Sequence, residues 1–189
     1  LYRGEKIINW DPAQKTALSN IEVIYKETKS CMYYFKYNIV GENDYLEVAK
    51  EIYKREDIFF IGRKIDFAVS MEGSLKLKEV SYIHSEAYQA GELKHGTISL
   101  VDEGTPVISI ITDKDIKEKT ISNVQEVKAR GAKCIIISNE EITGYDHLIQ
   151  VPKMSDFFQP LVVVPCLQLI AYEVAKLRGC DIDKPKNLA

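Results

Sequence analysis

Short apolar runs alternate with helix-length segments from residue 57 onwards. The runs are apolar at consecutive positions, and they predict strands over 58–62, 106–111, 134–138 and 147–151. Strands that are apolar on both faces are typical of parallel sheets covered by helices. The segments between them predict helices over about 65–82, 113–130 and 155–178. This alternation predicts a doubly wound α/β fold with a parallel sheet.

Several residues mark where these elements begin and end. Thr112 and Asp113 are predicted to cap the middle helix, and Gly131 to end it. Pro165 would kink the last helix or mark a later start. Ligands of doubly wound sheets bind at the carboxyl edge of the strands, so we expect a site at that edge. The helix after Gly62 is expected to begin there.

The N-terminal part of the chain is less regular. Asp11 and Pro12 are predicted to open one helix, and a second helix is predicted over Tyr45–Arg55. We therefore predict a helical N-terminal segment, residues 1–56, that packs on a domain formed by residues 57–189.

Charge and composition narrow the class of partner. The chain has 189 residues, 46% hydrophobic residues and a net charge of −3, as expected for one globular domain. Nucleic acid is not predicted as a partner, because binding to phosphate backbones needs a clustered excess of Lys and Arg. A small anionic ligand is compatible with this charge. The chain begins with Leu1, and we expect it to be part of a longer protein.

Cysteine usage and hydropathy bear on the compartment. The four cysteines form no CxxC pair and no Cys/His spacing typical of zinc, so no metal site is predicted. Cys134 and Cys166 lie in apolar runs and are predicted to be buried free thiols. We find no signal peptide and no apolar run of membrane-spanning length, so we expect a cytoplasmic protein and no membrane partner.

The segment Leu75–Gly96 holds the densest group of residues that could do chemistry. Lys76 and Glu79 are three residues apart and share a face if the segment is helical. A carboxylate can take a proton from carbon beside a carbonyl, while a cation stabilises the developing enolate oxygen. The same spacing is also typical of a solvent-exposed ion pair on a helix, and spacing alone does not separate the two interpretations.

His95 lies in the same segment, at the end of a helix predicted from about Glu86. It could transfer protons near neutral pH, or it could interact with the helix terminus before Gly96. Glu86 and Glu92 could suggest glycoside hydrolysis, but capping or surface roles explain them as well. Tyr82 is interpreted as a core or interface aromatic residue, and His147 as structural.

Three separated segments resemble the second sugar-isomerase (SIS) half of the glutamine:fructose-6-phosphate amidotransferases. They are EGSLKLKE at 72–79, EAYQAGELKHG at 86–96 and PCLQLIAYEVAKLRGCDIDKPKNLA at 165–189. The resemblance covers about residues 57–189 and implies the SIS fold, a flavodoxin-like three-layer αβα sandwich. It implies the synthesis of glucosamine 6-phosphate from fructose 6-phosphate and glutamine, with no metal or organic cofactor.

The resemblance also assigns roles by position. Glu79 is similar to the base that moves a proton between C1 and C2, and Lys76 to an assisting residue. His95 is similar to the ring-opening histidine, which in this family serves the neighbouring subunit, so a homodimer is implied. Ala189, at the end of the closing motif, corresponds to a substrate-binding position.

Parts of the family pattern are missing from this chain. The glutaminase domain, the first SIS half with its phosphate-binding loop, and the Schiff-base lysine that follows the closing motif do not occur in it. The isolated chain is therefore expected to be inactive. Two alternatives remain open: a stand-alone SIS module that binds a sugar phosphate, and another SIS enzyme such as an isomerase or deglycase.

Overall fold

The computed structural model describes residues 10–11, 13, 16–17 and 42–186. The chain divides into two compact units, Leu1–Val40 and Gly41–Ala189. In the first unit, β1 (Trp10–Asp11) and β2 (Thr16–Ala17) form a short antiparallel pair. The helix predicted after Pro12 is therefore wrong at Thr16–Ala17, and the remainder of that prediction lies outside the described residues.

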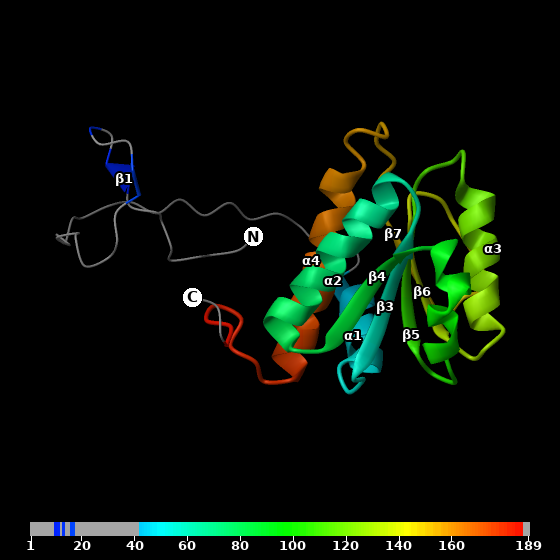
Figure 1. Ribbon diagram of the computed structural model, residues 1–189, viewed down its shortest axis with the longest axis horizontal. Coiled ribbons are helices and arrows are strands. Elements are labelled where there is room, and N and C mark those ends of the chain that lie inside the picture. Colours follow the sequence, from blue (N-terminus) through cyan, green and yellow to red (C-terminus); the bar gives the residue numbers. More distant parts are fainter. Residues whose placement is uncertain (1–9, 12, 14–15, 18–41, 187–189) are drawn as a thin grey trace. The chain divides into compact units, whose positions relative to one another are not determined.

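A five-stranded sheet forms the centre of the second unit (Figure 1). Neighbouring strands are all parallel, in the order β4-β3-β5-β6-β7, which confirms the predicted parallel α/β sheet. Within this sheet β3 comes first along the chain. β4 lies on one side of β3, and the chain then crosses over to form β5 on the other side. The strands are β3 (Asp57–Gly62), β4 (His84–Gln89), β5 (Pro106–Ile111), β6 (Lys133–Ser138) and β7 (His147–Gln150).

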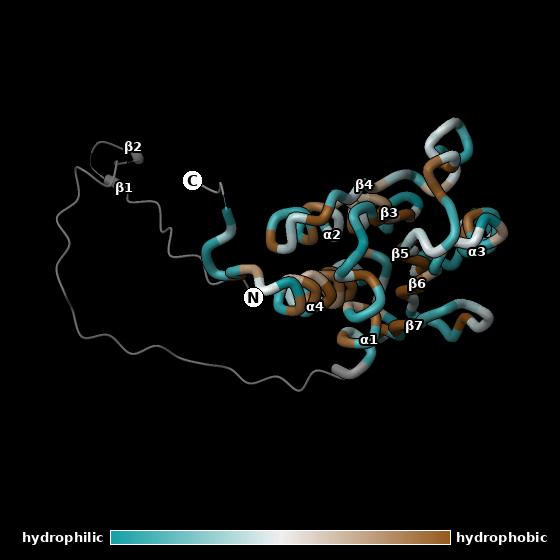
Figure 2. Tube along the Cα trace, turned by 90° about the horizontal axis from the view of Figure 1, so that it is seen from below, coloured by the Kyte–Doolittle hydropathy of each residue, from teal (hydrophilic) through white to brown (hydrophobic). Residues whose placement is uncertain are grey.

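Helices cover both faces of this sheet (Figure 2). Ile108 and Ile110 of β5 pack in one core cluster with α1, α2 and α4, whereas Val107 and Ile111 pack in a second cluster with α3. The alternation follows from the two-residue period of a strand and confirms the three-layer arrangement. The helices are α1 (Glu42–Ile52), α2 (Ile65–Ser81), α3 (Lys117–Lys128) and α4 (Pro160–Leu177), with short 3-10 helices η2 (Glu92–His95) and η3 (Thr97–Leu100).

Helix α1 belongs to the unit that contains the sheet. Its Tyr45 hydroxyl donates a hydrogen bond to Cys166 Sγ of α4 at 3.2 Å. Both Cys166 and Cys134 are buried free thiols, as predicted, and burial raises the pKa of the Cys134 thiol to about 11. The division of the chain at residue 56 stays a prediction.

The segment after α2 differs from its prediction. Residues 84–89 form the edge strand β4, and only Glu92–His95 are helical, as a 3-10 turn. In the described part of the chain β4 pairs with β3 alone, and of its six residues only Ser85 is buried, so polar residues fit this strand. The polar composition of this segment led to the prediction of a helix from about Glu86. Pairing with β3 makes it a strand instead.

The loop after β5 contains a second difference. α3 begins at Lys117, so Thr112 and Asp113 do not cap it. The backbone N–H and hydroxyl of Thr112 instead donate hydrogen bonds of 2.8 and 2.5 Å to the buried Asp66 carboxylate at the start of α2. Burial raises the pKa of this carboxyl, and the Thr112 hydrogen bonds act against that rise. Gly131 follows α3 with φ 89°, as expected for a residue that ends a helix.

Helix α4 is long and apolar. Its 18 residues have a mean hydropathy of 1.5, so by length and composition alone it could cross a membrane. In this fold its inner residues, including Val163, Leu167 and Val174, pack in the core with α1 and α2. The helix starts at Pro160 and continues through Pro165, so the later start considered for it is wrong. α4 is best described as the core helix of this unit.

We predict that Asp66→Ala lowers the free energy of unfolding by about 2–3 kcal/mol, because the buried Thr112 N–H and hydroxyl lose their acceptor. Urea denaturation of the chain measures this change. Asp115→Ala is the matched control, since Asp115 is exposed and its removal should change stability by less than about 0.5 kcal/mol. Equal effects of the two substitutions would contradict the prediction.

Candidate functional site

Lys76 and Glu79 form an ion pair on the last turns of α2. Lys76 Nζ lies 2.7 Å from Glu79 Oε2 and 3.9 Å from Glu72 Oε1. The side chains of Lys76 and Glu79 are 26% and 16% exposed. The pair is thus shielded from solvent more than an ordinary surface pair, and a ligand can still reach it. Its geometry is compatible with both interpretations of the spacing.

This pair lies at the amino edge of the sheet. α2 starts beyond the carboxyl end of β3, as predicted, and it must return to the start of β4 because the two strands are parallel. Glu79 therefore precedes β4 by five residues. We expected the site at the carboxyl edge, and the structure has these two residues at the opposite one.

His95 lies beyond the other end of β4. It is the last residue of η2 and is exposed. Two neighbours fix its loop: Leu93 is buried in the core below α3, and Lys94 Nζ lies 2.5 Å from Glu126 Oε1 of α3. β4 has six residues, which corresponds to about 17 Å of strand. Glu79 and His95 of one chain therefore lie at opposite edges of the sheet and do not form one site.

The remaining candidates have structural partners. The Tyr88 hydroxyl donates to the Glu86 carboxylate, whose other oxygen lies 3.8 Å from His84 Nε2. His147 Nε2 lies 2.5 Å from Glu51 Oε2, which agrees with the structural role predicted for it. Ala189 lies outside the described residues. Among the residues that the structure describes, no group of three His, Cys, Asp or Glu side chains could hold a metal ion.

Tyr82, interpreted from the sequence as a core or interface aromatic residue, lies at the same edge, and its contact there was not predicted. It follows α2 directly, is 37% exposed, and its hydroxyl accepts a hydrogen bond from the backbone N–H of Lys186 at 2.7 Å. The C-terminal tail thus reaches the end of the helix that carries Glu79. The sequence contains no signal for this contact, because the two residues are 104 positions apart.

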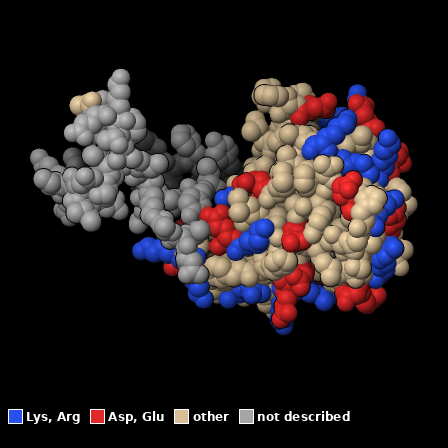
Figure 3. Space-filling model, in the orientation of Figure 1, with Lys and Arg blue, Asp and Glu red and all other residues tan. Residues whose placement is uncertain are grey.

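The molecular surface carries charges of both signs. On the face shown in Figure 3, acidic and basic side chains are interspersed around an uncharged area. A nucleic-acid interface would show a continuous basic patch. This face therefore does not have the charge distribution of a nucleic-acid interface, whereas a half-buried acid–amine pair suits a small polar ligand.

The fold and the pair together define a three-layer α/β domain with a candidate proton-transfer site at the amino edge of its parallel sheet. The chain belongs to the SIS domain family, whose model matches residues 51–176. The matched range includes Lys76, Glu79 and His95.

Curated relatives agree with this assignment. The chain is 52% identical over 145 residues to the isomerizing glutamine–fructose-6-phosphate aminotransferase of Clostridium acetobutylicum, covering 75% of the chain and 24% of the relative. It is 46% identical over 182 residues to the same enzyme of Caldanaerobacter subterraneus, covering 93% of the chain and 30% of the relative. The chain therefore spans about a quarter to a third of these relatives.

Solved structures give the same result. The C-terminal domain of glucosamine-fructose-6-phosphate aminotransferase from Francisella tularensis matches with a TM-score of 0.72 and 37% identity, over 76% of the chain and 42% of that protein. A glucosamine-6-phosphate deaminase from Thermotoga maritima matches with a TM-score of 0.62 and 27% identity, over 78% of the chain and 44% of that protein. The resemblance in sequence to the SIS half of the amidotransferases is thereby confirmed.

We predict that Glu79→Gln changes the free energy of unfolding by less than about 1 kcal/mol, because a partly exposed ion pair contributes little to stability. Urea denaturation measures the change. Glu47→Gln is a matched control, since Glu47 pairs with Lys50 at the same i,i+3 spacing and the same 2.7 Å on α1. A much larger loss for Glu79→Gln than for Glu47→Gln would show that the pair is chiefly structural.

Proposed function

We propose that this chain is the second isomerase half of an enzyme that makes glucosamine 6-phosphate from fructose 6-phosphate and glutamine. The observation that carries the proposal is the half-buried Lys76–Glu79 pair at 2.7 Å, within the range matched by the SIS family model. The identity to aminotransferases supports it. A glutaminase domain and a first SIS half would complete the protein, and the isolated chain is expected to be inactive.

In this proposal Glu79 is the base that moves a proton between C1 and C2 of the open-chain sugar. The carboxylate accepts the proton from one carbon and returns it to the other, so it ends each cycle ionised. Lys76 balances the negative charge that develops on the adjacent oxygen. Because Lys76 also approaches Glu72, its ammonium can move towards the substrate oxygen while the helix keeps it close to Glu79.

His95 would open the sugar ring in the active site of the partner subunit. The basis for this step is its place beyond the carboxyl end of β4, about 17 Å of strand away from the Glu79 end. A histidine transfers protons near neutral pH, as ring opening requires. We therefore propose a homodimer in which each site combines Glu79 of one subunit with His95 of the partner subunit.

A second candidate is an SIS enzyme that acts without glutamine. The likeness to a glucosamine-6-phosphate deaminase at 27% identity is the observation in its favour. The higher identity to aminotransferases argues for the first candidate. We further propose a cytoplasmic location, which suits the free thiols of Cys134, Cys166 and Cys180.

The test of the proposal uses the complete reading frame. Glu79→Gln should reduce isomerisation of fructose 6-phosphate by orders of magnitude, because the amide cannot accept the proton. Glutamine hydrolysis should persist, since the proposed site takes no part in it. Both activities are measured on the same preparation, with Glu47→Gln as the control. Full isomerase activity in Glu79→Gln would remove this residue from the mechanism, and activity without glutamine would favour the second candidate.

Mixed dimers test the sharing of sites. Glu79→Gln and His95→Asn subunits should each be inactive alone, whereas a hybrid dimer contains one site with both residues intact. Random pairing of equal amounts makes half of the dimers hybrids, so the mixture should regain about a quarter of the wild-type isomerase activity and purified hybrids about a half. Co-expression with two affinity tags isolates the hybrids for this assay. If purified hybrids stay inactive, Glu79 and His95 do not meet across a dimer.

A further inference from the structure

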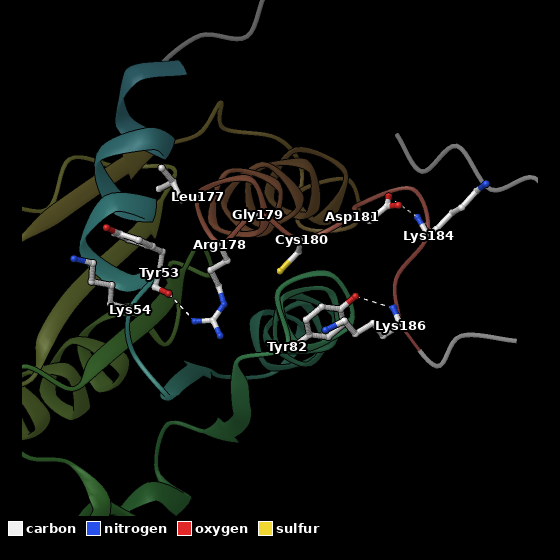
Figure 4. A pocket seen from close by; sticks show the side chains of 10 residues that line it. All are labelled: Tyr53, Lys54, Tyr82, Leu177, Arg178, Gly179, Cys180, Asp181, Lys184 and Lys186. Carbon is white, nitrogen blue, oxygen red and sulfur yellow. Dashed lines mark hydrogen bonds between the residues drawn. The ribbon is translucent and has the colours of Figure 1, made fainter.

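A concavity of about 690 Å³ lies at the amino edge of the sheet, where three helices end (Figure 4). Tyr53 directly follows α1, Tyr82 is the C-cap of α2, and Leu177 is the last residue of α4. The segment after α4, as far as Lys186, also lines the concavity. Its volume is that of a site for a small molecule. The proposed proton-transfer pair is not part of its lining.

Cationic side chains dominate this lining. Four of the lining residues are basic, namely Lys54, Arg178, Lys184 and Lys186, and Asp181 is the one acidic residue among the described residues that line the concavity. The whole chain, in contrast, has a net charge of −3. Asp181 is already engaged, because its Oδ1 accepts hydrogen bonds from two backbone N–H groups of the turn that follows it.

The four cations lack carboxylate partners in the part of the chain that the structure describes. Arg178 Nη1 donates to the Tyr53 carbonyl at 2.7 Å. The Lys54 ammonium lies 5.4 Å from the centre of the Tyr53 ring, and the Lys186 ammonium lies 5.3 Å from the centre of the Tyr82 ring. Lysines on α1, α2, α3 and α4, in contrast, lie beside carboxylates. Acidic side chains therefore do not compensate the positive charge at the concavity.

Helix ends compensate only part of this charge. The C-terminus of a helix carries roughly half a negative charge, so the ends of α1, α2 and α4 together supply roughly −1.5. After Asp181 is also counted, an excess of roughly 1.5 positive charges is left. A phosphate monoester carries about −1.5 to −2 charges at pH 7. The charge of one such group thus matches the excess at the concavity.

The arrangement of the side chains suits a phosphate group. In Figure 4 the Arg178 guanidinium points into the space between Tyr53 and Tyr82, whereas the Lys184 side chain points away from it. A guanidinium has five N–H donors in a planar fork that fits phosphate oxygens, and the Tyr53 carbonyl accepts a bond from one nitrogen only. The Lys186 ammonium lies over the Tyr82 ring on a flexible stem, so it can turn towards the same oxygens.

We propose that this concavity binds a small phosphorylated sugar, with Arg178 and Lys186 holding the phosphate group. The volume leaves room for a sugar ring beside the phosphate, and the rings of Tyr53 and Tyr82 offer it flat faces. The site is separate from the Lys76–Glu79 pair. The inference does not depend on the proposed function.

The experiment titrates inorganic phosphate, fructose 6-phosphate and fructose into the 189-residue chain and follows the backbone amides by NMR. Phosphate and fructose 6-phosphate should shift the amides of Tyr53, Tyr82 and residues 177–186, and fructose should not. Lys186→Gln and Arg178→Gln should each weaken the affinity for phosphate about tenfold, because each removes a charged hydrogen-bond donor. Lys186→Gln keeps the backbone N–H that bonds to the Tyr82 hydroxyl, so the fold of this segment should persist.

Lys176→Gln is the matched control. Lys176 is also an exposed basic residue at the end of α4, but it pairs with Glu173 and does not line the concavity. This variant should leave the affinity for phosphate unchanged within about twofold, because a partly screened surface charge contributes little at a distance. Glu79→Gln should leave it unchanged as well.

Each outcome supports or overturns the proposal. Equal weakening by Lys176→Gln and Lys186→Gln would show general charge attraction and refute a site. Fructose that binds as well as fructose 6-phosphate would refute recognition of the phosphate. Equal weakening by Glu79→Gln would place the phosphate at the proposed catalytic residues and refute a separate site. Isomerase activity of the complete protein tests the proposed function alone, so its absence would leave this inference standing.

Discussion

The connection from β3 through α2 to β4 is the constraint on which the rest of this structure depends. Parallel strands require a crossover, so the 17 residues of α2, about 25 Å of helix, must carry the chain back across the sheet. This return places the last turns of α2 at the amino ends of the strands. β4 then starts at the amino ends and runs to the carboxyl ends. Close packing keeps the helix in place: a Cβ on Gly73 would lie 2.9 Å from Leu167 Cδ1 and 3.1 Å from Phe60 Cε1.

The same constraint explains which parts of the fold could be predicted. The strand predicted at 106–111 has the observed bounds, and that at 58–62 is one residue short, because central strands buried on both faces are apolar at every position. β4 was missed because an edge strand can carry Glu86 and Gln89. The Thr112–Asp66 hydrogen bonds join residues 46 positions apart, so the sequence pattern indicated a local cap instead.

Sequence reasoning predicted the Lys76–Glu79 pair but not its location, and it did not predict that His95 lies apart from the pair. Helical spacing correctly brought Lys76 and Glu79 together, since an i,i+3 pair depends only on the helix itself. The edge at which they lie depends on how far α2 runs, and the general rule for doubly wound sheets pointed to the other edge. Tyr82 was named from the sequence only as a core or interface aromatic residue, because its left-handed backbone and its contact with Lys186 arise only in the folded chain.

The separation of Glu79 from His95 would make a site that uses both residues depend on the pairing of subunits. Two groups held at opposite ends of a six-residue strand cannot approach each other without unfolding β4, whose pairing with β3 runs over its whole length. In the proposed mechanism, joint action of Glu79 and His95 therefore needs two subunits, and the fraction of complete sites would follow the fraction of dimer. Ring opening by His95 and proton transfer by Glu79, as proposed above, would then occur together only in paired subunits, so a single subunit would hold neither a complete site nor a way to complete one by local motion.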